Sequence, residues 1–239
     1  GTIGRVGDAD GEFRLPLGIA TDKSGNVYVI DMMRCRLQKF SPDGAFLASA
    51  GNDGVVRLWS VADLAVTREF RGHERPVYSL AYHPSGEFLL SGDLMGVVRQ
   101  WAVESTNDKE IRSFKSEPLH KYEGGQGVDY GGIRAISFAP DGHAFVTAGL
   151  IEASNPLGAV SNPALMTFDW ASAKASPVIR PKADLKGVAW GVVWHPAGFL
   201  VMASGGTGGG HLLFFKPDQT NEFAQLNLTN TARSLSAHP

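Results

Sequence analysis

Apolar and polar positions alternate along this chain in short runs. Stretches of valine, leucine, isoleucine and aromatic residues are brief, and single glycines or prolines separate them. This punctuation is typical of many short β-strands joined by tight turns. No segment longer than about ten residues keeps the helical spacing of apolar residues without a glycine or proline inside it. The pattern therefore predicts an all-β protein that is nearly free of helix.

The alternating pattern also repeats. Four segments share the order of a strand, a Pro-x-Gly turn and a second apolar strand: residues 39–50, 80–92, 136–149 and 192–204. A fifth, SLSAHP, ends at Pro239, the last residue. Successive prolines of these turns are separated by 42, 56, 56 and 43 residues. A period of about 40 to 45 residues with four strands per unit indicates a β-propeller, in which each unit is one blade.

Two further strands complete each predicted unit. A third apolar strand follows each segment, and a fourth, more polar strand is expected at the outer edge of the blade. The third strands are residues 55–61, 97–103, 164–170 and 211–217, and the fourth are residues 67–72, 111–116, 176–181 and 223–228. The two longer intervals hold insertions at 103–131 and 150–163. We expect extended loops there, because lengthening a loop costs little entropy.

Two successive units carry a recurring set of polar and aromatic residues. The second has Gly72-His73 before a strand, Ser91 on the second strand and Trp101 on the third, and the first has Ser49, Asp53-Gly54 and Trp59 at the matching places. From residue 45 onward the chain therefore resembles the WD-repeat family. The resemblance implies a propeller whose blades each contain a hydrogen-bonded network of His, Ser or Thr, Asp and Trp.

Neither unit holds the whole set in the expected positions. Asp53 and Trp59 have no Gly-His pair upstream, and the unit with His73 and Trp101 has Met95 where the turn aspartate is expected. The two final units keep still fewer of these residues. We therefore expect the propeller fold with incomplete networks inside the blades.

The first part of the chain follows a different pattern. The run GEFRLPLGIATDKSGNVYVIDMMRCRLQKFSPDG resembles the NHL repeat, and it departs from that repeat at Arg34-Cys35, where asparagine is usual. The two patterns meet inside the turn at residues 41–44. We predict one propeller over residues 1–239, with an NHL-like blade segment at 1–44 and WD-repeat-like blades at 45–239. The strand at 36–41 fits either an NHL blade or the innermost place of a WD-type blade.

Closure of the ring is the next expectation. Strands at 2–6, 18–22 and 26–31 and a C-terminal strand at 232–237 are left over from the repeats. Because a propeller removes its exposed edges by joining its ends, we expect these four to form a composite closing blade, the fifth in the ring. If the strands at 18–22 and 232–237 both take the innermost place of a blade, they cannot share one closing blade. The alternatives are then a sixth, incomplete blade or pairing with a second chain.

Charge and composition narrow the classes of partner. The chain has 22 basic and 24 acidic residues, so its net charge of -2 gives no electrostatic basis for binding nucleic acid. Its hydrophobic content is 43%, and no apolar run approaches the 18 residues of a membrane span. The single cysteine, Cys35, cannot form an internal disulfide, and no secretory leader is recognisable. We expect a cytoplasmic monomer, with the sequon at 227–229 a chance match.

Candidate sites for ions and phosphates are weak. Asp8 to Glu12 lacks the further oxygen ligands of a calcium loop, so a solvated turn is favoured. The glycine-rich residues 204–210 lack the helix and lysine of a phosphate loop and are expected to form a long flexible hairpin. Five of the seven histidines are considered as metal ligands: His73, His83, His195, His211 and His238. Three of these, His83, His195 and His238, recur directly before turn prolines and would be separated by whole blades, so no metal or cofactor site is predicted.

Catalysis has no sequence support either. No Gly-x-Ser-x-Gly elbow occurs, and no serine, histidine and acid can be placed together from sequence alone. We therefore predict no catalytic residue and no enzyme activity. The five tryptophans, Trp59, Trp101, Trp170, Trp190 and Trp194, are expected to pack between blades.

Three functions from different classes remain. The change of repeat pattern within one shared turn, together with a first residue that is not methionine and an end partway through a turn, favours an engineered or recombined chimera that acts as a scaffold with no evolved ligand. The alternative is a natural platform that binds a protein or peptide through loops such as 103–131 and 150–163. The third is an enzyme with a metal in the axial channel.

Overall fold

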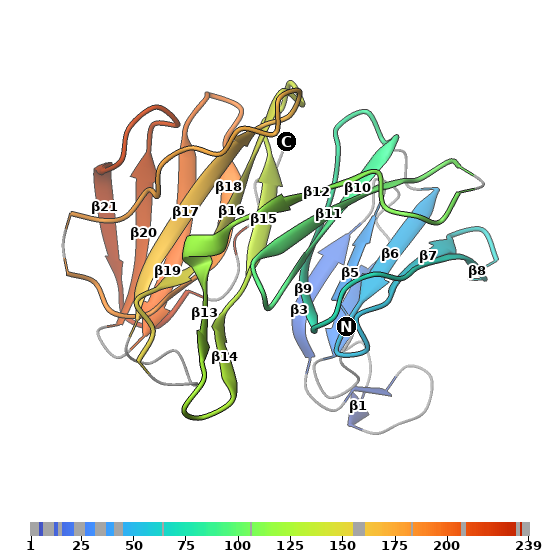
Figure 1. The fold of residues 1–239 in the computed structure, drawn as a ribbon, viewed down its shortest axis with the longest axis horizontal. Helices are drawn as coiled ribbons and strands as arrows, with labels where there is room; N and C mark the ends of the chain where they lie inside the picture. Colours follow the sequence, from blue (N-terminus) through green and yellow to red (C-terminus); the bar gives the residue numbers. More distant parts are fainter. Residues whose placement is uncertain are drawn as a thin grey trace.

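The structure is a computed structural model. It describes the backbone of five strands before residue 41 and then residues 45–63, 65–105, 107–154, 161–182, 184–206, 209–232 and 235. Nearly all described strand pairs are antiparallel, which confirms the all-β prediction. Figure 1 shows successive sheets arranged side by side, with the later strands on the left and the earlier strands on the right.

Two sheets of four strands each follow the predicted WD-type order. Each runs consecutively, from an innermost strand beside the neighbouring sheet to an outer edge strand. The first contains β5 (Leu37–Phe40), β6 (Phe46–Ala50), β7 (Val56–Ser60) and β8 (Val66–Phe70), and the second contains β9 (Val77–Tyr82), β10 (Phe88–Asp93), β11 (Val97–Ala102) and β12 (Arg112–Lys115).

The two later sheets differ at the outer edge. One has β15 (Ala135–Phe138), β16 (Ala144–Ile151) and β17 (Asn162–Asp169), and the other has β18 (Val188–Trp194), β19 (Leu200–Gly206), β20 (Gly209–Phe215) and β21 (Glu222–Leu228). The prediction of a fourth strand at 176–181 was wrong. Only isolated bridges, from Leu165 to Ile179 and from Phe168 to Ala175, join this segment to β17. Pro177 and Pro181 lack the N–H groups that a regular ladder requires.

The N-terminal strands form separate small sheets. β1 (Arg5–Val6) and β2 (Glu12–Phe13) pair in parallel, and β3 (Pro16–Thr21) pairs with β4 (Val27–Asp31), close to the predicted strands at 18–22 and 26–31. β5 pairs with β6 and not with β4, so the strand at 36–41 takes the innermost place of the WD-type blade. Most of the predicted closing strand at 232–237 lies outside the described residues, and closure and the number of blades stay predictions.

The Pro-x-Gly motif forms the same turn in three blades. The N–H of Gly86 donates to the carbonyl of His83 at 2.9 Å, and Gly142 and Gly198 donate in the same way to Ala139 and His195. All three glycines have positive φ, of 81°, 74° and 85°. Side chains rarely adopt that conformation, so the turn requires the glycine that made the repeat visible.

The insertion at 103–131 is not an extended loop as expected. It contains β12, the short 3-10 helix η2 (Glu117–Leu119) and a hairpin of β13 (His120–Glu123) and β14 (Val128–Gly131). We call the hairpin of residues 120–131 the insertion hairpin. Figure 1 shows it projecting beyond the ends of β15 and β16. Apolar residues buried beside it fix its position, and a loop prediction from glycine content could not foresee them.

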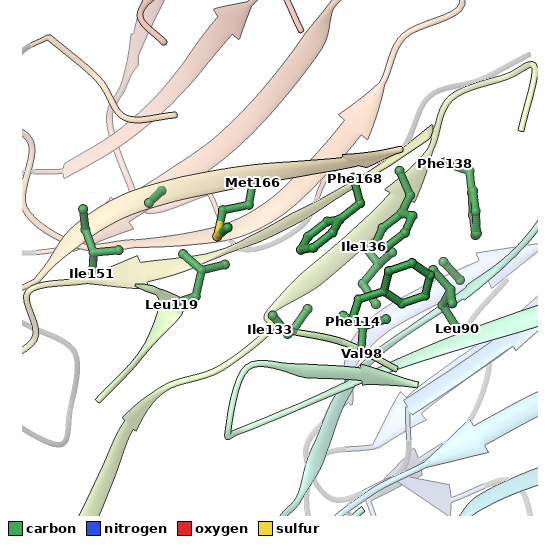
Figure 2. Packing of buried hydrophobic residues seen from close by; sticks show 13 residues of the cluster. Leu90, Val98, Phe114, Leu119, Ile133, Ile136, Phe138, Ile151, Met166 and Phe168 are labelled. Carbon is green, nitrogen blue, oxygen red and sulfur yellow. The ribbon is translucent and has the colours of Figure 1, made fainter. Parts of the chain in front are cut away.

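The core lies between sheets. Leu90, Val98 and Phe114 of the β9–β12 sheet meet the β15–β17 sheet in one cluster, shown in Figure 2. Its other members include Leu119, Ile133, Ile136, Phe138, Phe145, Met166 and Phe168. A second cluster joins β5–β8 to β9–β12, where the rings of Trp101 and Phe70 stack at 5.2 Å, and a third joins β15–β17 to β18–β21. Each sheet therefore buries its apolar faces against its neighbours.

The predicted packing of tryptophans between blades holds for Trp101 and Trp170, and also for Trp190 and Trp194, which pack against clusters that span two sheets. Trp101 is fully buried against Phe70 of the preceding sheet, and Trp170 lies 5.7 Å from Phe88 between their ring centres. Arg112 of β12 lies over the Trp170 ring at 4.7 Å and donates to the carbonyl of Trp170. Trp59 has a polar role described below.

Phe145 tests the contribution of this core. The residue is fully buried and stacks on Phe168 at 4.9 Å, so Phe145→Ala should lower the free energy of unfolding by about 3 to 5 kcal/mol. Urea unfolding followed by circular dichroism measures the change. The control is Phe223→Ala at a ring that is 53% exposed, which should cost less than about 1 kcal/mol. Equal losses for the two variants would contradict a core between the sheets.

Candidate functional site

A buried polar network lies inside the β9–β12 sheet. The Nδ1 atom of His73 is 2.7 Å from Oδ2 of Asp93, and its Nε2 atom is 2.7 Å from Oγ of Ser91. The Nε1–H of Trp101 donates to the same Ser91 oxygen at 2.7 Å. All four residues are buried. One blade therefore holds the complete set of His, Ser, Asp and Trp.

The chemistry of the donors fixes how the hydrogens are arranged. An ionised carboxylate only accepts, so Nδ1 of His73 donates to Asp93. The indole N–H only donates, so the Ser91 oxygen accepts from Trp101. Ser91 can then donate its own hydroxyl hydrogen to Nε2 of His73. Every polar group of the network has a partner in this arrangement, as buried polar groups require.

The aspartate of this network corrects the sequence analysis, which looked for it at Met95. Asp93 takes the role instead, from the end of β10, two residues after Ser91. The register between β9 and β10 shifts between Gly92 and Asp93, which turns the carboxylate toward His73. Its Oδ1 atom also accepts the N–H groups of Met95 and Val97, at 2.9 and 3.0 Å. The available signal was an aspartate directly before the Leu-Met-Gly turn.

Ser91, His73 and Asp93 also have the hydrogen-bond order of a nucleophilic triad. A nucleophile needs access to its substrate, whereas the exposed fractions of the His73 and Asp93 side chains are 0% and 3% and Ser91 is fully buried. The Trp101 N–H also occupies the oxygen that would attack. The arrangement therefore stabilises the blade and offers no reaction site in this conformation.

The residues at the position of Ser91 on the second strand of the other blades form fewer of these hydrogen bonds. In the β5–β8 sheet the Trp59 N–H donates to Ser49 Oγ at 2.8 Å, and in the β15–β17 sheet Thr147 lies 3.1 Å from Ser116 between their hydroxyl oxygens. The buried Ser204 hydroxyl of β19 has no hydrogen-bond partner among the described residues. The prediction that the final units retain less of the network is consistent with these contacts.

The other residues singled out from the sequence do not come together. His83 contacts Ser85 of its own turn and the Gly142 carbonyl of the turn in the next blade, and His195 accepts from the Ala197 N–H of its own turn. No group of three or more His, Cys, Asp or Glu side chains suited to a metal occurs among the described residues. Cys35, His238 and residues 8–11 lie outside the described residues.

The glycine-rich segment at 204–210 is not the long flexible hairpin that was expected. β19 and β20 stay paired as far as Gly206 and Gly209, on either side of residues 207–208, which lie outside the described part. A side chain at Gly205 would collide with Thr231, and one at Gly210 would collide with the Asn230 carbonyl. These glycines let residues 230–231 cross the strands closely.

The insertion hairpin and the second insertion, at 150–163, lie at the same end of the sheets, which we call the insertion end. In an antiparallel blade the connection from the second to the third strand and the connection to the next blade leave from one end. Residues 152–161 join β16 to β17, and the insertion hairpin lies between β12 and β15. The strands extend into the second insertion, as far as Ile151 and from Asn162 onward, and residues 155–160 lie outside the described part.

Ion pairs attach the insertion hairpin to the preceding sheet. Asp129 accepts from Arg75 Nε at 2.9 Å and lies 2.9 Å from Nε2 of His120. Partial burial raises the pKa of the Asp129 carboxyl, but the hydrogen bonds from His120 and Arg75 outweigh it and leave the pKa below its usual value. The same pair raises the pKa of Arg75. Arg75 precedes β9, so this contact links the hairpin to another blade.

Apolar contacts hold the other side of the insertion hairpin. Tyr130 is buried in a cluster with Leu150 and Val188, against which Val128 also packs. Gly131 and Gly132 follow with φ of 105° and 94°, and a side chain at Gly131 would collide with the Leu119 carbonyl. Tyr122, in contrast, is 59% exposed. The hairpin is thus a fixed element that presents an aromatic side chain to solvent.

Comparison with known proteins agrees with this geometry. The model of the WD domain, G-beta repeat, matches residues 20–60 and 65–101. The chain is 36% identical over 66 residues to the general transcriptional corepressor TUP1 of Saccharomyces cerevisiae, which is 28% of this chain and 8% of the corepressor. WD40 repeats are therefore present in the matched residues.

Solved structures show the same fold. The β-propeller domain of Cps50 (Swd1) from Myceliophteria thermophila aligns with a TM-score of 0.63 and 20% identity, over 84% of this chain and 58% of that one. Hydrazine synthase of Kuenenia stuttgartiensis aligns with a TM-score of 0.63 and 17% identity, over 80% of this chain and 48% of that one. The second of these is an enzyme by name. No helix in the described part is long and apolar enough to cross a membrane.

Ser91 and Ser204 form a matched pair for testing the network. Ser91→Ala leaves the buried Trp101 N–H and His73 Nε2 without partners, so we expect a loss of about 1 to 3 kcal/mol in the free energy of unfolding. Ser204→Ala removes a buried hydroxyl that has no partner among the described residues, and it should be neutral or stabilising. Urea denaturation measures both. A larger loss at Ser204 than at Ser91 would show that the network is not stabilising.

Asp129→Asn tests the attachment of the insertion hairpin. The change removes the carboxylate that Arg75 and His120 contact, so the amide hydrogens of residues 120–131 should exchange faster at pH 7. The control is Asp184→Asn, at a side chain that is 79% exposed, which should leave this exchange unchanged. The pKa of Asp129 is lower in the folded state than in the unfolded state. Its contribution to stability is therefore fully present above the unfolded pKa of about 3.9 and is lost as the pH falls from there through the folded-state pKa. Unchanged exchange in Asp129→Asn would show that the ion pair of Asp129 with Arg75 does not hold the insertion hairpin in place.

Proposed function

We propose that this chain is a protein-interaction platform, a β-propeller with WD40 repeats whose partner docks at the insertion end. The observation that carries the proposal is the insertion hairpin, which is fixed by Asp129 and Tyr130 yet leaves Tyr122 exposed. Aromatic residues held rigidly at the centre of a surface are frequent anchors of protein interfaces. A fixed hairpin also loses little entropy on binding, which favours affinity.

Electrostatics and comparisons support the same class of function. The net charge of -2 gives no general attraction for nucleic acid, so a protein or peptide fits the surface better. One relative, similar over 66 residues, is named a general transcriptional corepressor. We propose further that the chain acts as a monomer and without catalysis, since the triad-like network in the described part is buried.

The hybrid origin predicted from the sequence has less support. The WD match at 20–60 begins inside the NHL-like segment and crosses the turn at 41–44 without a break. β5 also joins the following blade. The NHL resemblance and an engineered join stay predictions, and the platform function depends on neither. We likewise keep the proposal that the strands predicted at 2–6, 18–22, 26–31 and 232–237 close the ring as one blade.

The test compares two exposed apolar residues at opposite ends of the blades. Tyr122 lies on the insertion hairpin, whereas Ile111, which is 50% exposed, lies in the connection from β11 to β12 at the far end. In quantitative pull-down with photo-crosslinking, Tyr122→Ala should weaken capture of partners by about 30-fold, the effect of losing an anchor worth about 2 kcal/mol. Ile111→Ala should leave capture unchanged.

Shortening the hairpin gives a second measurement. A variant in which residues 122–127 are replaced by a two-residue Asn-Gly turn should lose the same partners as Tyr122→Ala. If both hairpin variants retain every partner captured by the unchanged chain, the insertion hairpin is not the docking surface.

A further inference from the structure

Three side chains from three successive blades meet at the insertion end. Tyr78, Arg134 and Trp190 stand at or directly before the start of the innermost strands β9, β15 and β18, and all three are half-buried. β9 packs beside β15, and β15 packs beside β18. The three residues therefore occupy equivalent positions around the axis on which the innermost strands converge.

Irregularities of the sheets bring these side chains to that position. Tyr78 falls in the register shift between β9 and β10, and Trp190 falls in the shift between β18 and β19. At the start of β15 the N–H of Arg134 donates to the Ala148 carbonyl at 2.8 Å, although Ala148 already faces Ala135. An extra residue in one strand of a pair redirects its side chain, and such bulges are frequent next to binding sites.

Arg134 lies over both aromatic rings. Its Cζ atom is 4.3 Å from the ring centre of Tyr78 and 5.7 Å from that of Trp190. Trp190 in turn packs against the cluster that holds the insertion hairpin, and its N–H donates to the Gly205 carbonyl at 3.3 Å. The arginine is thus placed by groups that are themselves fixed.

The charge of Arg134 has no acidic partner in the described part of the chain. Among the described residues, the buried Nε atom has no hydrogen-bond partner and no carboxylate forms an ion pair with the guanidinium. The carboxylate of Asp129 is engaged by Arg75 and His120. Burial lowers the pKa of Arg134 below its ordinary value, but an arginine stays charged at neutral pH. A partly desolvated cation without a counter-charge is costly.

The Tyr78 side chain hydrogen-bonds with the guanidinium of Arg134, and the other N–H groups of the guanidinium are left for a ligand. A guanidinium over a ring uses its face, whereas its N–H groups point outward in its own plane. That geometry matches the two oxygens of a carboxylate, which can accept two parallel hydrogen bonds. A nucleic-acid backbone needs several cations in a row to be held, and this site offers one.

We propose that Arg134, held by Tyr78 and Trp190, is the receptor for an aspartate or glutamate side chain of a bound peptide. This inference rests on the proposed function and adds the chemistry of the partner. The partner would contact the insertion hairpin and place one carboxylate at the converging starts of β9, β15 and β18.

The experiment uses the whole chain and a defined peptide. Fluorescence anisotropy of labelled hexaglutamate measures binding to the unchanged protein, to Arg134→Gln and Arg134→Lys, and to the control Arg180→Gln, whose side chain is 60% exposed. Arg134→Gln should weaken binding by about tenfold or more. Arg134→Lys keeps the positive charge but loses the two parallel N–H donors of the guanidinium, so it should weaken binding by less. Arg180→Gln should bind like the unchanged protein.

A local signal keeps the proposal testable if Arg134→Gln fails to fold. In the unchanged protein, the Nε–H resonance of Arg134 should shift when hexaglutamate is added and should not shift with hexalysine. Equal weakening by Arg134→Gln and Arg180→Gln, or binding without any shift of that resonance, would overturn the site. Stronger displacement of the peptide by inorganic phosphate than by acetate at equal concentration would overturn the assignment to a carboxylate.

The two proposals can fail separately. If hexaglutamate does not bind but Tyr122→Ala still abolishes capture of partners, the platform stands and the carboxylate receptor is wrong. If hexaglutamate binds through Arg134 while the hairpin variants keep all partners, the receptor stands and the hairpin is not the docking surface.

Discussion

The structure depends on the packing of each sheet against the next. Within a sheet of four strands the apolar residues have no second layer, so they become buried only when a neighbouring sheet covers them. Trp101 on Phe70 and Phe145 beside Phe114 are contacts of this kind. The same packing sets the innermost strands side by side, and it therefore determines which side chains converge at the insertion end.

The polar groups have a complementary role. The network of His73, Ser91, Asp93 and Trp101 binds two strands, β10 and β11, and the loop before β9 together, because each member needs the others to satisfy its hydrogen bonds. Apolar contacts thus join blades, and buried polar contacts fix the geometry within one blade. The insertion hairpin uses both: Tyr130 packs in a cluster, and Asp129 pairs with Arg75 of another sheet.

The sequence revealed what repeats and missed what occurs once. The Pro-x-Gly turns recur because each needs a glycine with positive φ, so the strand order followed from their spacing. Asp93 was missed because a register shift, which no residue pattern shows, brings it to His73. The insertion hairpin was missed because its support comes from residues distant in sequence, such as Arg75 and Leu150. At 176–181 two prolines override an otherwise suitable edge-strand pattern.

The bulged starts of the inner strands have a consequence for evolution and engineering. Each one gives up regular pairing at the place where it aims Tyr78, Arg134 or Trp190 inward. Straightening those ladders would favour a more regular and more stable sheet, yet it would turn the three side chains away from one another. Gains in rigidity at these positions would therefore come at the expense of recognition, and variants selected only for thermal resistance should drift toward losing it.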